Sequence, residues 1–295
     1  MDLLSIADLS KYEIEKILSL SKTKQKSITG KHVVALLFEK PSTRTRTSFE
    51  SAATRIGWSS IYLDSLSLQM SRGESIEDTA KVLSMYVDMI VARLGSHKDI
   101  ERVASSSTVP VINALTDLEH PCQALSDLYT INEAKGKLHG LKIAFVGDIA
   151  TNTANSLMIG AVKMGAAMAL VGPKSWKPNE KYFEMAKKYG SIEVYNNMKD
   201  GLEDADIVYT DTFVSMGKES EAARRRRIFT PYQINERTLD YADDKALVMH
   251  CLPAHRGEEI TTEVLDGRRS LAWKQAANKL PVEEAILEYV WRSEN

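Results

Sequence analysis

Short apolar runs alternate with amphipathic stretches along nearly the whole chain. Runs rich in valine, isoleucine and leucine are typical of buried parallel strands, and apolar residues recurring every three or four positions predict helices. Strands are expected at 32–37, 60–63, 88–92, 110–114, 141–147, 167–172, 192–195, 206–210 and 247–250. Helices are expected at 5–29, 97–104, 121–135, 155–164, 179–189, 231–239 and 281–291, and after the polar segments 42–45 and 65–74. This alternation predicts an α/β protein with two doubly wound, mostly parallel sheets.

The 295 residues are enough for two domains of ordinary size. We expect one domain at 1–132 and a second at 133–276, with the C-terminal helix within 277–295 packing back on the first. Individual ends are marked by capping residues: Ser75 with Asp78 has the spacing of a capping box, and Thr230 before Pro231 is typical of a helix start.

The chemically reactive side chains follow the expected strands, at the point where each strand ends. They lie at 42–46, 93, 120–123, 148–155, 211–217 and 250–256. In open α/β sheets, ligands bind outside the carboxyl ends of the strands. The pattern therefore predicts an active site in a cleft between the two domains, lined by loops from both sheets.

The segment 38–50 joins an apolar strand to a helix and carries Ser42, Thr43, Arg44, Thr45 and Arg46. Free backbone N–H groups and the positive end of the helix dipole converge at such a junction. Hydroxyl and guanidinium groups add donors and charge suited to an anion, and phosphate is favoured. The alternative is an ordinary helix cap with solvated arginines, although capping needs only one such residue.

His120 and Gln123 flank the expected helix start at Pro121 and can hydrogen-bond a carbonyl oxygen on which negative charge develops. An isolated His-Pro turn is more often structural, so this interpretation depends on the neighbouring anion segment. Arg93 directly follows an apolar strand and is a second cation suited to the same anion or carbonyl.

Cys251 follows His250 at the end of an apolar strand and allows several interpretations. Adjacent strand residues point to opposite faces, so His250 is poorly placed to activate Cys251 as a nucleophile. A thiolate or polarisable contact to a substrate is favoured. A zinc site built from His120, Cys122, His250 and Cys251 is disfavoured, because the paired spacing of zinc ligands is missing.

Three polar segments in the second half have weaker signals. Asp211 is a candidate partner for a substrate cation, and Gly217 after it is a candidate hinge for a closing loop. The four arginines at 224–227 are typical of a solvated helix face. Asn152 and Asn155 suit a substrate carboxylate or amine, and the turn around them lacks the glycines of a dinucleotide site.

Composition excludes several classes of protein. The chain is 43% hydrophobic and 26% charged with a net charge of −2, which is typical of a globular protein without a basic field for nucleic acid or membrane. No apolar run approaches the ~20 residues of a membrane span, and the N-terminal residues lack a signal-peptide pattern. Only two cysteines indicate a reducing compartment, so we expect the cytoplasm.

The motifs at 42–46, 120–123, 211–217 and 250–253 resemble those of the transcarbamoylase family and stand in the same order, and the resemblance runs from about residue 5 to the end. Cys122 and the last two motifs are similar to those of its ornithine-using branch. The resemblance implies transfer of the carbamoyl group from carbamoyl phosphate to the δ-amine of L-ornithine, giving citrulline and phosphate in arginine metabolism. It also implies no metal or organic cofactor, and a homotrimer or an assembly of trimers with active sites at subunit interfaces.

The same motif match implies roles for individual residues. Carbamoyl phosphate would be bound by Ser42, Thr43, Arg44, Thr45, Gln69, Arg93, His120, Gln123, Cys251, Leu252 and Lys279, with Gln69 reaching in from a neighbouring subunit. Ornithine would be bound by Asn152, Asp211, Ser215 and Met216. The groups expected to act in the chemical step are Arg44, Arg93, His120, Asp211 and Cys251.

Two positions depart from the family pattern. Lys279 stands where an arginine is usual, and a lysine supplies charge without the planar two-pronged contact. Thr151 stands where the first of two asparagines is usual.

Other functions remain open at this stage. They are a transcarbamoylase for putrescine or aspartate, and a non-catalytic protein that binds an anion or RNA. A nicotinamide dehydrogenase is disfavoured by the missing glycines. The sequence carries no signal for arginine synthesis as against breakdown.

Overall fold

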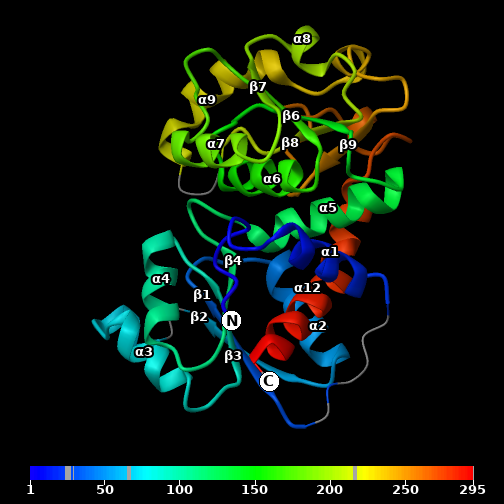
Figure 1. Cartoon of the computed structure of the whole chain (residues 1–295). Helices are drawn as coiled ribbons and strands as arrows, with labels where there is room; N and C mark the ends of the chain where they lie inside the picture. The colour runs from blue at the N-terminus through cyan, green and yellow to red at the C-terminus, as the bar shows by residue number, and fades with distance from the viewer. Residues whose placement is uncertain (24–27, 29, 65–67, 215–217, 295) are drawn as a thin grey trace. The chain divides into compact units, whose positions relative to one another are not determined.

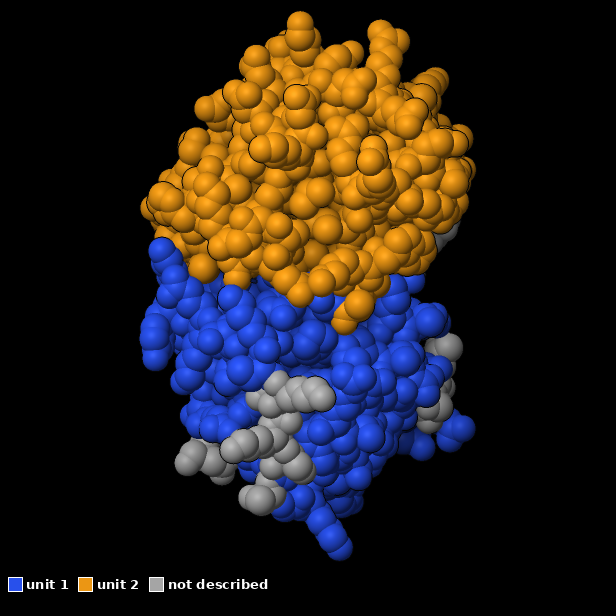
Figure 2. All heavy atoms as spheres, turned by 90° about the vertical axis from the view of Figure 1, so that its right-hand side faces the viewer, with its two compact units in different colours: residues 1–129, 278–295 blue, residues 130–277 orange. Residues whose placement is uncertain are grey.

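Two parallel sheets organise the chain, and the prediction from the alternation of strands and helices is confirmed. The structure is a computed structural model that describes all residues except 24–27, 29, 65–67, 215–217 and 295. The chain divides into unit 1, formed by Met1–Tyr129 with Asn278–Asn295, and unit 2, formed by Thr130–Ala277 (Figure 2). Each boundary falls inside a helix, namely α5 (Pro121–Lys135) and α12 (Ala272–Glu294).

Unit 1 contains a sheet of four parallel strands in the order β2-β1-β3-β4. Its strands are β1 (Val33–Phe38), β2 (Ser59–Asp64), β3 (Met89–Arg93) and β4 (Val111–Leu115). Its other elements are α1 (Lys11–Leu20), α2 (Arg44–Arg55), the 3₁₀ turn η2 (Gln69–Arg72), α3 (Ile76–Leu83) and α4 (His97–Ser106), besides its parts of α5 and α12. The pairing of Phe38 with Arg93 brings the end of β1 beside the end of β3.

Helices cover both faces of this sheet, so the central strands β1 and β3 are buried almost throughout, whereas the edge strand β2 is partly polar and partly exposed. In Figure 1, α3 and α4 lie on one side of the strands, and α2 and α12 lie on the other. The buried residues on the α3 and α4 side come from three strands and both helices, among them Ala35, Leu37, Ile90, Ala92, Val111, Ile76, Ala80, Ile100 and Val103. The chemistry described below therefore rests on a rigid, fully packed sheet.

Unit 2 contains a sheet of five parallel strands in the order β7-β6-β5-β8-β9. Its strands are β5 (Lys142–Val146), β6 (Ala167–Val171), β7 (Ile192–Tyr195), β8 (Ile207–Thr210) and β9 (Leu247–His250). Its helices are α6 (Asn152–Lys163), α7 (Glu180–Lys187), α8 (Met198–Leu202), α9 (Ala222–Phe229), α10 (Glu236–Leu239) and α11 (Thr262–Leu265), with the 3₁₀ turns η3 (Glu219–Glu221) and η4 (Thr230–Tyr232). Figure 1 shows α6 and α7 on one face of the sheet and α8 on the other.

Several helix ends differ from the sequence-based prediction. The expected helix at 5–29 is shorter, because Ser10 and Glu13 form a capping box that starts α1 at Lys11. The helix predicted at 155–164 starts earlier, at Asn152, because the Thr151 side chain accepts a hydrogen bond from the N–H of Ala154.

The helix predicted at 231–239 is wrong. The segment holds the short turn η4 (Thr230–Tyr232) and then α10, for which Asn235 provides the capping box. The last helix was predicted from residue 281, but α12 begins at Ala272 and contains Pro281 in its interior. A proline is usually read as a helix start, and here that signal placed the start more than two turns late.

Two further helix predictions are confirmed. The helix predicted at 121–135 is α5, with the same bounds. Ser75 caps α3 by accepting a hydrogen bond from the N–H of Asp78. Among the described residues, no helix is long and apolar enough to cross a membrane.

Candidate active site

The junction between β1 and α2 forms the first part of the site. Helix α2 begins at Arg44, and the N-cap residue Thr43 makes no capping hydrogen bond with its side chain. Thr45 is buried in the first turn, whereas Ser42 and Arg44 are half-buried. The first-turn N–H groups of a helix have no partner within the helix, so this junction offers backbone donors and side-chain hydroxyls to an anion.

Arg46 does not belong to this group, although the sequence pattern included it. Its Nε donates to Oε1 of Glu50 at 3.0 Å, one helical turn further on. Its guanidinium also stacks on the ring of Tyr62, 3.6 Å from the centroid. Both contacts turn the side chain toward β2, so Arg44 is the arginine of this segment that remains for a ligand.

Arg93 is the last residue of β3 and is 6% exposed. Burial and the nearby charge of Arg44 lower its pKa to about 10, so the side chain is still a cation at neutral pH. Its Nε is buried and makes no hydrogen bond to any residue that the structure describes. Two neighbouring cations with a buried donor free of a described protein partner suit the binding of an anion.

His120 lies just before α5 and is 7% exposed. Burial, together with the charges of Lys279 and Arg93, holds the pKa of His120 well below its ordinary value. The imidazole is therefore neutral at neutral pH, and a neutral imidazole can donate one hydrogen bond to a carbonyl oxygen. The electrostatic coupling also brings His120, Arg93 and Lys279 into one neighbourhood, as the loop pattern predicted for the first two.

Gln123 lies one turn into α5 and is held from two sides. Its Nε2 donates to Oδ1 of Asp127 at 2.8 Å, and its Oε1 accepts from Nζ of Lys279 at 3.4 Å. Lys279 comes from α12 and also forms a buried ion pair with Glu283, with 3.1 Å between Nζ and Oε1. Unit 1 thus gathers Arg44, Arg93, His120, Gln123 and Lys279 in one cationic cluster.

Cys122 is not positioned to contact a substrate. The residue is fully buried, and its thiol donates to the carbonyl oxygen of Asn113 at 3.3 Å. Burial and the nearby carboxylate of Glu283 raise the pKa of the thiol, so it stays protonated. Of the groups of possible metal ligands in the described part of the chain, none contains His120 or Cys122.

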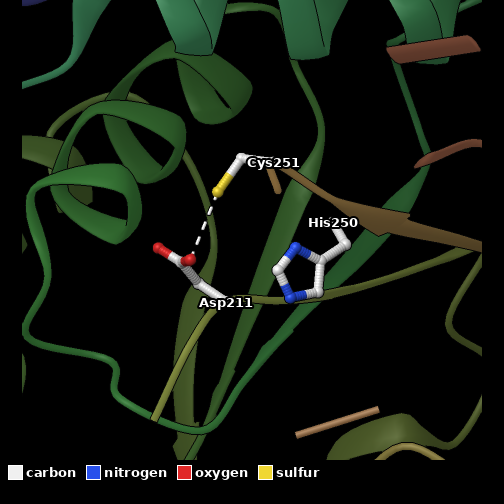
Figure 3. A group of neighbouring side chains, drawn as sticks. All are labelled: Asp211, His250 and Cys251. Carbon is white, nitrogen blue, oxygen red and sulfur yellow. Dashed lines mark hydrogen bonds between the residues drawn. The ribbon is translucent and has the colours of Figure 1, made fainter. Parts of the chain in front are cut away.

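In unit 2, the ends of β8 and β9 bring Asp211 and Cys251 together. The thiol of Cys251 donates to Oδ1 of Asp211 at 3.2 Å, and both side chains are half-buried. Figure 3 shows the thiol pointing at the carboxylate, with the ring of His250 beside them. One ligand atom from each of the three residues lies within 4.8 Å of the others.

His250 has a structural role behind this pair. Its Nδ1 accepts the N–H of Leu252 at 2.9 Å, so the ring proton lies on Nε2 and is donated to Oε1 of the fully buried Glu259 at 3.1 Å. Leu252 has a φ of 58°, which is strained for a residue with a branched side chain. Because both ring nitrogens are engaged, we assign neither a metal ligand nor a base role to His250.

The third segment of unit 2 is the turn after β5. Asn152 is the first residue of α6, and its Oδ1 accepts the N–H of Thr153 at 2.8 Å. Nearby, Asp148 forms a buried ion pair with Arg225 of α9, and the Nε of Arg225 donates to the carbonyl oxygen of Phe213 at 2.7 Å. The prediction of a solvated face at 224–227 is therefore wrong for Arg225, which is 3% exposed and ties the loop after β8 to the loop after β5.

The remaining expected residues are exposed or lie outside the described part of the chain. Gln69 is exposed at the start of η2. Ser215, Met216 and the candidate hinge Gly217 lie outside the described residues. Sequence reasoning missed four supporting side chains: Asp127, Arg225, Glu259 and Glu283. Two of them were detectable, since Gln123 with Asp127 and Lys279 with Glu283 have the spacing of one helical turn.

Comparison with known proteins identifies both halves of the chain. Residues 1–133 match the family model "Aspartate/ornithine carbamoyltransferase, carbamoyl-P binding domain", and residues 139–290 match "Aspartate/ornithine carbamoyltransferase, Asp/Orn binding domain". Among curated proteins, the chain is 47% identical to the ornithine carbamoyltransferase of Anoxybacillus flavithermus, over 97% of this chain and 95% of that protein.

Solved structures agree. The chain is similar to the ornithine carbamoyltransferase of Pyrococcus furiosus, with a TM-score of 0.92 and 44% identity, over 97% of this chain and 95% of that one. It is also similar to the anabolic ornithine carbamoyltransferase of Campylobacter jejuni, with a TM-score of 0.94 and 35% identity, over 100% of this chain and 99% of that one.

Proposed function

Because the chain belongs to the aspartate/ornithine carbamoyltransferase family, we propose that it transfers the carbamoyl group of carbamoyl phosphate to the δ-amine of L-ornithine, which yields L-citrulline and phosphate. The observation that carries the proposal is the cluster at the strand ends of unit 1. There, buried Arg93 is coupled electrostatically to Arg44 and to the neutral His120. Such a cluster suits a phosphate attached to a carbonyl group.

In this proposal, carbamoyl phosphate binds to unit 1 through its two chemical parts. The phosphate is held by the backbone and hydroxyls of the β1–α2 junction and by the cations around it: Ser42, Thr43, Arg44, Thr45 and Lys279. The carbamoyl oxygen is held by donors from Arg93, His120 and Gln123. The unused Nε of Arg93 and the open helix start of α2 support these roles.

Ornithine binds to unit 2 through Asp211 and Asn152, with Ser215 and Met216 completing its site. Free ornithine carries a δ-ammonium with a lysine-like pKa of about 10.4, so the amine must lose a proton before it attacks. The Asp211 carboxylate attracts the ammonium, and the Cys251 thiol, hydrogen-bonded to the same carboxylate, orients it. Cys251 and Leu252 line the place where the amine meets the carbamoyl group.

The reaction then follows from charge. The neutral amine attacks the carbamoyl carbon, a C–N bond forms, and the carbonyl oxygen becomes an oxyanion stabilised by Arg93, His120 and Thr45. Collapse of this intermediate breaks the bond to the phosphate oxygen, the attacking nitrogen gives its extra proton to the departing phosphate, and Arg44 with the helix start stabilises that phosphate. Positioning and preorganised charge supply the rate enhancement.

The alternative is a transcarbamoylase that uses putrescine or aspartate. Names of similar proteins favour ornithine. The test is to incubate the protein with carbamoyl phosphate and each amine in turn and to measure the carbamoylated product. Citrulline formed at a rate at least tenfold above the other two products supports the proposal, and carbamoyl aspartate or carbamoyl putrescine as the main product refutes it.

We further propose that the protein is a homotrimer or an assembly of trimers, in which Gln69 completes the site of a neighbouring subunit. Three exposed apolar side chains at the end of α3 support an interface: Val82, Met85 and Tyr86 are 42%, 75% and 71% exposed. A molar mass about three times the 32.9 kDa of one chain, or a multiple of that, is the expected result of light scattering.

The cellular setting is part of the same proposal. Two free cysteines support the cytoplasm as a reducing compartment. Similar proteins from P. furiosus and C. jejuni are named anabolic, which supports arginine biosynthesis as the pathway.

A further inference from the structure

A buried lysine and a buried glutamate stand one helical turn apart in α12. Nζ of Lys279 lies 3.1 Å from Oε1 of Glu283, and the two side chains are 3% and 0% exposed. A buried ammonium is costly unless a carboxylate compensates its charge. Lys279 and Glu283 therefore form a buried ion pair within one helix.

The pair contacts, or is coupled electrostatically to, several residues around the expected carbamoyl-phosphate site. Lys279 reaches Oε1 of Gln123 in α5, and its charge lowers the pKa of His120. On the opposite side, Glu283 lies near the hydroxyl of Ser48, one turn after Thr45 in α2. The Glu283 carboxylate thus contacts both Lys279 of α12 and Ser48 of α2, the helix whose first residues are expected to hold the phosphate.

We propose that Glu283 is a positioning residue for carbamoyl-phosphate binding: its carboxylate holds the side-chain nitrogen of Lys279 in place beside Gln123. The proposal rests on the proposed function only for the identity of the anion. Without the carboxylate, the buried side chain of Lys279 loses the partner that fixes its direction, so it turns away from Gln123.

Arginine behaves differently from lysine at such a position. A guanidinium stays charged without a counterion, and its planar fork can reach Gln123 and an oxyanion together. A lysine at position 279 therefore needs the Glu283 carboxylate to hold it in place for the anion, whereas an arginine at that position does not. If Glu283 positions Lys279, replacing Lys279 by arginine should restore phosphate binding in the Glu283→Gln protein. If Glu283 only supports the folding of α12, the replacement should not restore it.

The test compares Glu283→Gln with the double variant Lys279→Arg/Glu283→Gln. We measure the dissociation constant of inorganic phosphate by calorimetry, and the KM of carbamoyl phosphate and of ornithine in the citrulline assay. In Glu283→Gln, the phosphate dissociation constant and the carbamoyl-phosphate KM rise about tenfold or more, the loss expected for one partner of a charged hydrogen-bonded group. The ornithine KM changes less than about twofold, and the double variant recovers most of the phosphate affinity.

Glu284→Gln is the matched control. Glu284 is the next residue of α12 and is 8% exposed, but it pairs with Arg55 at 3.4 Å, at the other end of α2 from the anion site. Phosphate affinity should be unchanged in this variant. If Glu283→Gln misfolds by circular dichroism, Glu283→Asp keeps the charge and withdraws it by one methylene, and should weaken phosphate binding by a smaller factor.

Three results would overturn the inference: unchanged phosphate affinity in Glu283→Gln, an equal rise in the KM of both substrates, or no recovery in the double variant. A failure of the proposed function would give a result different from these three. If the unaltered protein makes no citrulline, the phosphate titrations still decide whether Glu283 positions Lys279.

Discussion

Cys251 donates its thiol hydrogen to Oδ1 of Asp211 at 3.2 Å, although the two residues are 40 positions apart in the chain and follow different strands. The parallel pairing of β8 with β9, in which Thr210 is opposite His250, places the two following residues side by side. The register of the β8–β9 pairing therefore brings Asp211 and Cys251 together. A carboxylate and a thiol in this arrangement suit a substrate ammonium that must be deprotonated.

The first prediction concerns this pair. Asp211→Asn removes the charge that attracts the δ-ammonium, so kcat/KM for ornithine should fall by about 10²-fold or more while the KM of carbamoyl phosphate changes little. Cys251→Ala should cost about tenfold, and Cys251→Ser, which keeps a donor to Asp211, should cost less. Asp204→Asn is the control, because Asp204 is exposed on the turn before β8. Equal kinetics in Asp211→Asn and the control would contradict the assignment.

The second prediction separates two arginines of the anion segment. Arg44→Ala should lower turnover by about 10²–10³-fold, as for the loss of one donor to a developing negative charge. Arg46→Ala, two residues further on, loses only the partly exposed contact to Glu50 and the ring of Tyr62, so turnover should stay within about threefold. Steady-state kinetics of both variants provide the measurement. Near-normal turnover in Arg44→Ala would refute the phosphate role.

The third prediction follows from the lowered pKa of His120. The unfolded chain takes up a proton on this ring below about pH 6.5, whereas the folded chain does so only at lower pH. The free energy of unfolding should therefore fall as the pH drops below about 6.5, by at most ~1.4 kcal/mol per pH unit from this group. The direct measurement is the imidazole resonance of His120 in the phosphate-free protein, assigned with His120→Gln. It should keep the shift of the neutral ring down to pH 5.5, and a midpoint near pH 6.5 would contradict the account.

The fourth prediction concerns the buried ion pair of Arg225 and Asp148. Arg225→Met leaves a buried carboxylate without its counterion and should destabilise unit 2 by about 3–5 kcal/mol. The double variant Arg225→Met/Asp148→Asn should recover part of this loss. Arg224→Ala is the control, because Arg224 is exposed in the same helix. Thermal unfolding of the four proteins tests the prediction, and an equal midpoint for Arg225→Met and the control would contradict it.

The fold was predictable from the sequence because a parallel sheet covered on both faces requires apolar strands and amphipathic helices in alternation. The strand ends were predictable for the same reason, and with them the grouping of Arg44, Arg93 and His120. Helix ends were less predictable. Pro281 suggested a start, yet it lies inside α12, where tertiary packing outweighs the lost backbone hydrogen bond.

The supporting side chains Arg225 and Glu259 were not predictable, because their roles depend on burial that the sequence does not display. The run 224–227 contains four arginines, and only the structure distinguishes buried Arg225 from exposed Arg224. Similarly, His250 resembled a possible base until its two nitrogens were found bonded to Leu252 and Glu259. Such distinctions arise from three-dimensional contacts between segments distant in the chain.

The most direct test of the central claim is to follow carbamoyl phosphate labelled with ¹³C at its carbonyl carbon, in the presence of L-ornithine, by NMR. The account predicts that the label moves into the ureido carbon of citrulline as phosphate is released in equal amount, and that Arg44→Ala slows this transfer by about 10²-fold or more. Label that appears only in carbamate or cyanate, at the rate seen without protein, would contradict it.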